Sequence, residues 1–157
     1  MTFKQFIRLP TVGLITAFLA MLVITPVCTA NADTSQEFGD YTVHFNAFNS
    51  DVLQPAMAEA YGIVRSKNRG MMTISILKKG PEGTTTPVRA SVTATASNLT
   101  GQFRQFNIRE INDSNSIYYI SVFHVAHEEM LDFTLQILPE GETKTHTVTF
   151  RQQFYTH

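Results

Sequence analysis

The sequence contains one cysteine and no tryptophan among its 157 residues. Because the single cysteine, Cys28, lies near the amino terminus, the chain beyond it has no thiol with which to form a disulfide. Neither sign of charge is in large excess, with 12 basic and 13 acidic residues. The composition therefore gives no support to binding of nucleic acid.

A long apolar stretch runs from Val12 to Ile24, and Lys4 and Arg8 precede it without any acidic residue. About 13 residues of helix rise only about 20 Å, short of a hydrocarbon core of roughly 30 Å, so we expect no stable insertion in a membrane. The profile instead predicts a secretory signal peptide, and the small residues of Ala30-Asn31-Ala32 predict cleavage after Ala32. Residues 1–32 are thus the predicted signal peptide.

The predicted mature chain, residues 33–157, is 125 residues long and fits a single domain. Loss of Lys4 and Arg8 leaves ten basic residues against 13 acidic ones, a formal charge of −3. We expect a periplasmic protein. The alternative is a lipoprotein anchored through Cys28, although Val27 and Thr25 stand where such a signal has a small residue and a leucine.

Apolar and polar residues alternate along the mature chain, and clusters of turn-forming residues separate the alternating runs. This pattern predicts an all-β fold, an immunoglobulin-like antiparallel β-sandwich of seven or eight strands. The seven strands are Tyr41 to Phe48, Met72 to Lys78, Val88 to Ser97, Phe103 to Glu110, Ile117 to Val125, Leu131 to Leu138 and Thr145 to Tyr155, with Ile63 to Ser66 as an optional eighth.

One segment departs from the alternation. The run Pro55 to Ala60 begins with proline and is followed by Gly62, which is the asymmetry of a short helix. We expect one or two helical turns there.

Several short motifs carry a resemblance to a known family. They are Phe38-Gly39-Asp40-Tyr41, His44-Phe45-Asn46-Ala47-Phe48, Leu53-Gln54-Pro55, Ala60-Tyr61-Gly62-Ile63, Arg65-Ser66-Lys67-Asn68 and Gln153-Phe154-Tyr155. With these motifs the chain resembles an uncharacterised proteobacterial periplasmic family, domain of unknown function 4426. The resemblance implies a Gram-negative periplasm, and it brings no activity, cofactor or catalytic residue with it.

Four histidines are candidate ligands for copper or zinc: His44, His124, His127 and His146. His124 and His127 are three residues apart on a predicted strand, whereas the metalloprotease motif has two histidines four apart on a helix. Met71 and Met72 are adjacent, so they should point to opposite faces of a strand rather than form a copper site together. The alternative interpretation is that all four histidines are surface or strand-end residues.

Arg65, Lys67 and Arg69 place three positive charges at alternate positions. On a strand they would share one face, where they could bind a carboxylate, a phosphate or an acidic partner. The alternative is a solvated edge whose charges prevent unwanted strand pairing.

No catalytic residues can be named from the sequence. It has neither a glycine-flanked nucleophilic serine nor a cysteine in the mature chain. Glu128 and Glu129 are adjacent and fit the charged end of a strand better than a glycosidase pair. We therefore predict a protein that is not an enzyme and has no cofactor, with an enzyme on the same scaffold as an alternative.

Aromatic residues are abundant in the second half of the chain: Phe103, Phe106, Tyr118, Tyr119, Phe123, Phe133, Phe150, Phe154 and Tyr155. They either fill the core or form an apolar patch or an exposed edge strand that receives another protein. The last strand, Thr145 to Tyr155, is the candidate edge. We predict a periplasmic binding or accessory module with an unknown protein partner, and a metal-binding protein is the alternative.

Overall fold

The structure is a computed structural model that describes residues 34–157. The predicted signal peptide, its cleavage after Ala32 and Cys28 lie outside the described residues. Residues 34–157 belong to one compact unit. In this part of the chain no helix has the length and apolar character needed to cross a membrane.

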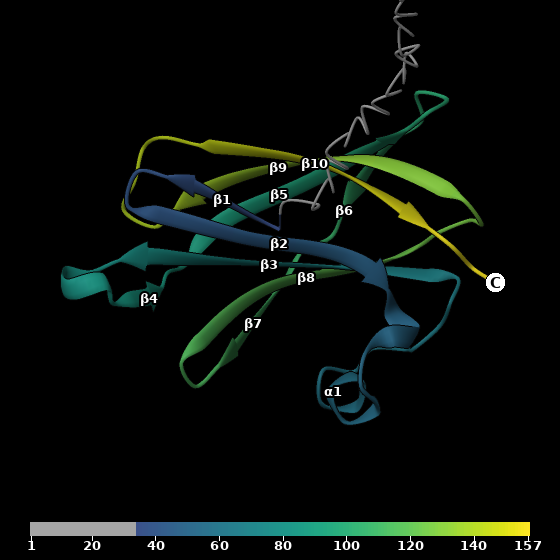
Figure 1. Ribbon diagram of the computed structural model, residues 1–157, viewed down its shortest axis with the longest axis horizontal. Helices are drawn as coiled ribbons and strands as arrows, with labels where there is room; N and C mark the ends of the chain where they lie inside the picture. The colour runs from purple at the N-terminus through teal and green to yellow at the C-terminus, as the bar shows by residue number, and fades with distance from the viewer. Residues whose placement is uncertain (1–33) are drawn as a thin grey trace, which may run out of the picture. The chain divides into compact units, whose positions relative to one another are not determined.

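Ten strands in the described residues form two antiparallel sheets that face each other (Figure 1). The six-stranded sheet has the order β1-β2-β3-β8-β7, with β4 beside β3, and the four-stranded sheet has the order β10-β9-β5-β6. The bounds are β1 (Ser35–Phe38), β2 (Tyr41–Asn49), β3 (Arg69–Lys79), β4 (Thr85–Pro87), β5 (Ala90–Asn98), β6 (Phe103–Phe106), β7 (Arg109–Asp113), β8 (Ser116–His124), β9 (Glu129–Pro139) and β10 (His146–Phe154). The predicted β-sandwich is confirmed.

The main core lies between the inner faces of the two sheets. Alternate residues of each strand point into it, for example Met72 and Ile74 of β3 and Phe133 and Leu135 of β9, all of which are buried. The intervening residues point outward, which is why alternation in the sequence identifies the strands.

The single strand predicted from Phe103 to Glu110 is wrong, because the chain here divides into β6 and β7, which belong to different sheets. Phe106 is buried in the core and Ile108 packs against it, so the alternation continues while the backbone crosses between sheets. The optional strand at Ile63 to Ser66 is absent, and the backbone of this segment bonds instead to the side-chain hydroxyl of Ser50. β1 and β4 are short strands that the sequence analysis does not predict.

The predicted helix is confirmed as α1 (Pro55–Ala60), in the connection between β2 and β3 that also holds the 3₁₀ turn Ser50–Val52. Gly62 ends the helical segment with a φ of +63°, a left-handed conformation that glycine adopts without steric cost. Ala58 of α1 is buried with Met71 and Ile120 in a second, smaller core on the outer face of the six-stranded sheet.

Candidate functional site

Two of the four candidate metal ligands lie in different sheets. His44 is exposed in β2, on the outer face of the six-stranded sheet. His146 begins β10 in the four-stranded sheet, and its ring packs against Phe38 with 4.7 Å between the ring centroids.

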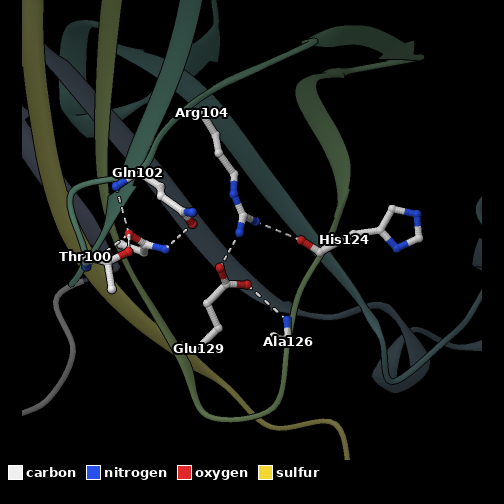
Figure 2. A network of polar contacts seen from close by, with 7 residues as sticks. Thr100, Gln102, Arg104, His124, Ala126 and Glu129 are labelled. Carbon is white, nitrogen blue, oxygen red and sulfur yellow. Dashed lines mark hydrogen bonds and ion pairs between the residues drawn. The ribbon is translucent and has the colours of Figure 1, made fainter.

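His124 and His127 lie at the connection between β8 and β9. Figure 2 shows the ring of His124 pointing away from the neighbouring Arg104. The ring of His127 lies beside His157, with 3.8 Å between centroids, and its Nδ1 accepts a 3.2 Å hydrogen bond from the Thr156 N–H. Within residues 34–157 no three His, Cys, Asp or Glu side chains form a group that could hold a metal ion. The structure does not gather the four candidate histidines into one site.

The three candidate basic residues do not share a strand, because Arg65 and Lys67 lie in the connection between α1 and β3 and only Arg69 lies in β3. The Arg65 guanidinium donates from Nη2 to the carbonyl oxygen of Asp51 at 2.6 Å. The Lys67 carbonyl accepts a hydrogen bond from Asn49 Nδ2, also at 2.6 Å. The common strand face on which the anion-binding hypothesis depends is therefore not formed.

An ion pair between Arg104 and Glu129 joins β6 to the start of β9 (Figure 2). Arg104 also donates from Nη1 to the carbonyl oxygen of His124 at 3.1 Å, and Glu129 Oε2 accepts the Ala126 N–H at 3.0 Å. These residues line part of an open hollow of about 690 Å³ at this end of the sandwich. The Glu129 side chain is only 9% exposed, and its two oxygens join Arg104 of β6 to the connection between β8 and β9.

The two adjacent acids have different surroundings. Glu129 is engaged by Arg104, whereas the Glu128 side chain is 68% exposed and its backbone turns with a φ of +58°. Glu129 begins β9, in agreement with its interpretation as the charged end of a strand.

The candidate edge strand, β10, is indeed an edge of the four-stranded sheet. It pairs with β9 over nine residues, and no strand of the described chain pairs with its other side. It contains no proline, lysine or acidic residue, which are the residues that commonly protect an edge from unwanted pairing. Its one charged side chain, Arg151, is held by Asp132 of β9.

The hydrogen bonds of the neighbouring strand identify the amides of β10 that face outward. The Glu140 N–H donates to the Arg89 carbonyl at 2.8 Å, which extends the β5–β9 ladder by one pair. Glu140 is even-numbered and bonds toward β5. Because alternate residues of a strand bond to opposite neighbours, the even-numbered residues of β9 bond to β5 and the odd-numbered ones bond to β10. Their partners in β10 are even-numbered. The backbone groups at the free edge are therefore those of Thr147, Thr149, Arg151 and Gln153, of which the Gln153 carbonyl accepts a 2.8 Å hydrogen bond from Gln152 Nε2.

A cleft of about 230 Å³ runs beside the free edge of β10. Thr149 to Gln152 form one wall, and the opposite wall comes from Thr34, Gln36 and the β2 segment 45–47. The rings of Phe45 and Phe150 meet across the two sheets here, with centroids 4.8 Å apart. A segment lying along β10 would thus also contact side chains of the other sheet.

A second, more apolar pocket, of about 440 Å³, lies between α1 and the outer face of the six-stranded sheet; we call it the α1 pocket. Two buried residues, Met71 and Ile120, form its floor, while Met57 and Tyr118 are exposed at its rim. The other lining residues are Phe48, Leu53, Tyr61, Thr73, Ile111, Asp113 and Ser116.

The abundant aromatic residues divide between core and surface. Phe106, Tyr119, Phe133 and Phe154 are buried, and Phe123 and Phe150 pack against them. Three remain exposed: Phe103 by 70%, Tyr155 by 54% and Tyr118 by 39%. Filling of the core therefore accounts for most of the aromatic content.

Comparison with known proteins identifies the family. A family described as a domain of unknown function, DUF4426, matches residues 35–157. The chain belongs to the DUF4426 family. A solved DUF4426 family protein from Pseudomonas aeruginosa PAO1 is 35% identical, with a TM-score of 0.68 over 80% of this chain and 97% of that one.

A second solved structure shares the fold of this DUF4426 chain. It is FetP from uropathogenic Escherichia coli strain F11, recombinantly expressed in the periplasm, with 11% identity and a TM-score of 0.57. The likeness covers 80% of this chain and 95% of FetP, and at this identity it concerns the fold alone. No curated protein matches the chain.

Sequence reasoning misses the α1 pocket of this DUF4426 protein. Tyr61, Asp113 and Tyr118 come from separate elements, and nothing in their spacing brings them together. A signal is nevertheless present in Met71 and Met72, because adjacent apolar residues in a strand imply that both faces of that strand are covered. The α1 segment is what covers the second face.

Proposed function

We propose that the mature DUF4426 chain is a non-enzymatic, immunoglobulin-like binding module of the periplasm, which receives an extended segment of another protein along the free edge of β10. The observation that carries the proposal is the character of this edge: nine residues long, regular in register, and without proline, lysine or acidic residues. An edge of this kind is a template for an added strand.

The other edges differ from β10 in ways that discourage pairing. β1 and β6 have four residues each and carry a charge, Glu37 and Arg104 respectively. β4 has three residues and ends at Pro87. β7 has five residues, of which Arg109, Glu110 and Asp113 are charged. β10 is therefore the edge in the described chain best suited to a partner strand.

The bond between Arg151 and Asp132 supports the same interpretation. An edge arginine that is free in solution would repel a basic segment and could reach over the edge. Here Asp132 holds the guanidinium through Nε at 2.5 Å and Nη2 at 3.0 Å. The outward backbone groups on either side of Arg151 thus stay accessible to a partner.

Backbone hydrogen bonds would supply the affinity of such a complex, at about 0.5–1.5 kcal/mol each. Four residues of β10 present their backbone groups outward, and specificity would come from side chains entering the cleft between β10 and β2. A partner segment with alternating small apolar and polar residues fits these two requirements.

Two observations support the periplasm as the site of action. One is the amino-terminal sequence, which has the pattern of a cleavable signal peptide. In addition, FetP, which shares the fold, was expressed in the periplasm.

Site-specific photocrosslinking in intact cells tests the proposal. A photoreactive amino acid at Thr147 reports on contacts at the edge, and the same residue at Ser75, on the outer face of the other sheet, serves as the control position. The full chain, with its signal sequence, is expressed in a Gram-negative host. We expect a discrete adduct with one other protein at Thr147 and none at Ser75.

A matched pair of substitutions separates strand addition from other contacts. Thr149→Pro removes an outward N–H, which an edge strand tolerates, whereas Thr149→Ala keeps it. We expect the adduct at Thr147 to disappear with proline and to persist with alanine. An adduct that both variants retain, an adduct with a second copy of this chain, or the absence of any adduct would overturn the proposal.

A further inference from the structure

The α1 pocket is independent of the edge of β10 and lies on the other sheet. It forms because four strands place large side chains outward in the region that α1 covers: Phe48 of β2 lies directly opposite Met71 of β3, and Tyr118 of β8 opposite Ile111 of β7. α1 and its flanks then close over these residues with Leu53, Met57 and Tyr61. At about 440 Å³ the pocket is within the size range of small-molecule sites.

The floor and the rim of the pocket differ in character. Met71 and Ile120 at the floor are 3% and 4% exposed, and both are apolar. Met57 and Tyr118 at the rim are 45% and 39% exposed, so both are accessible to a ligand. A ligand that covers these two side chains would remove apolar surface from water.

Asp113 is the one charged side chain among the residues that line the α1 pocket. Its Oδ2 accepts a 3.4 Å hydrogen bond from the Tyr61 hydroxyl, and no lysine, arginine or histidine within residues 34–157 forms an ion pair with it. The nearby Arg109 is instead engaged by the Tyr61 carbonyl, to which its Nη2 donates at 2.6 Å. The pocket therefore presents a carboxylate that forms no ion pair within residues 34–157.

The aromatic residues of the pocket also favour a positively charged ligand. Phe48, Tyr61 and Tyr118 line the pocket, and the faces of aromatic rings carry the negative part of their quadrupole, which attracts cations. The thioethers of Met57 and Met71 add polarizable surface that adapts to an apolar ligand body.

We propose that the α1 pocket binds a small organic cation, an alkylammonium group attached to an apolar body. The cationic head lies beside Asp113 and the aromatic rings of the pocket, and the apolar body lies on Met71 and Ile120. An anionic amphiphile would be repelled by Asp113, and an uncharged one would leave that carboxylate unpaired. Burial and the neighbouring Asp113 also raise the pKa of Tyr61, so its hydroxyl remains a neutral donor to the carboxylate.

Methionine methyl NMR on the purified exported protein locates such a ligand. The probe is (3-phenylpropyl)trimethylammonium, and its control is the uncharged carbon isostere in which a tert-butyl group replaces the trimethylammonium head. We expect the cation to shift the methyl signals of Met57 and Met71, and to leave those of Met72 and Met130, which do not line the pocket, in place. It should bind about tenfold more tightly than the isostere.

Two substitutions at the rim test why the pocket binds the cation more tightly than the uncharged isostere. Asp113→Asn should weaken binding of the cation by about fivefold and leave the isostere unchanged, while Asp40→Asn, in an exposed turn, should change neither. Tyr118→Leu keeps apolar bulk but removes the ring, and should also reduce the preference for the cation; Tyr155→Leu is its control. Equal binding of cation and isostere, shifts at Met72 or Met130, or no shift at millimolar probe would overturn the proposal.

Discussion

Arg151 and Asp132 pair side by side on the outer face of the four-stranded sheet, where β10 meets β9, and two hydrogen bonds of 2.5 and 3.0 Å join them. In the described chain this is the one ion pair that involves a side chain of β10. It fixes the one charge of an otherwise uncharged edge, and it therefore bears on both the stability and the recognition of this strand.

The Asp132–Arg151 pair should make stability depend on pH in the acid range. The hydrogen bonds from Arg151 hold the pKa of Asp132 below its ordinary value of 3.8 in the folded protein. A lowered pKa stabilises the fold above the unfolded pKa, and this contribution is lost as the pH falls through the folded pKa. We expect Asp132→Asn to unfold at lower urea concentration than the parent at pH 7, and the two to converge once the pH has fallen below the folded pKa of Asp132, which lies under 3.8.

The effect should be small, because both side chains are more than two-fifths exposed. Asp40→Asn, in the turn between β1 and β2, is the matched control. A difference between Asp132→Asn and the parent that stays constant from neutral to acid pH would contradict this account.

Gly70 leaves room for the ring of Phe123. A Cβ at position 70 would lie 2.5 Å from Phe123 Cε2 and 3.0 Å from Val125 Cγ1. The ring cannot easily move, since it packs against Phe106 with 4.6 Å between centroids. We expect Gly70→Ala to lower the free energy of unfolding by about 1–3 kcal/mol, measured by urea denaturation.

A double-mutant cycle identifies the clash. In a Phe123→Leu background, the shorter side chain should make the added methyl at position 70 less costly. If the alanine costs the same in both backgrounds, the ring is not the cause of the destabilisation.

Ser50 organises the connection that leads into β3. It is fully buried, and its Oγ accepts the Ser66 N–H at 3.0 Å and lies 3.0 Å from the Val64 carbonyl oxygen. Ser50→Ala removes these bonds, so we expect a loss of about 1–3 kcal/mol and faster hydrogen exchange at the Ser66 amide. Ser91→Ala, at an exposed position of β5, should change neither quantity. Unchanged exchange at Ser66 in the Ser50→Ala protein would count against this role.

The sequence predicts the elements of this fold well because alternation and turn residues act locally. Pro55 and Gly62 define α1, and the strand from Tyr41 begins where it is expected. The division at Asn107 is not visible, since Phe106 and Ile108 both face the one core that the two sheets share. Short strands such as β1 and β4 depend on neighbours that only the tertiary fold provides.

The candidate sites are less predictable, because alternation shows which face a residue occupies but not which strands are neighbours. His44 and His146 are both in predicted strands, yet those strands belong to different sheets. The edge at β10 is predictable from its position as the last strand. The α1 pocket depends on where one short connection folds back, and local patterns contain little of that information.

Amide hydrogen exchange along β10, with and without the captured partner bound, tests the central claim most directly. The amides of Thr147, Thr149 and Arg151 face outward, whereas those of Val148 and Phe150 already bond to β9. If a strand is added at the edge, the three outward amides should exchange rapidly in the free protein and become protected in the complex, while the two inward amides stay protected in both. Outward amides that continue to exchange rapidly with the partner bound would show that recognition occurs elsewhere on the molecule.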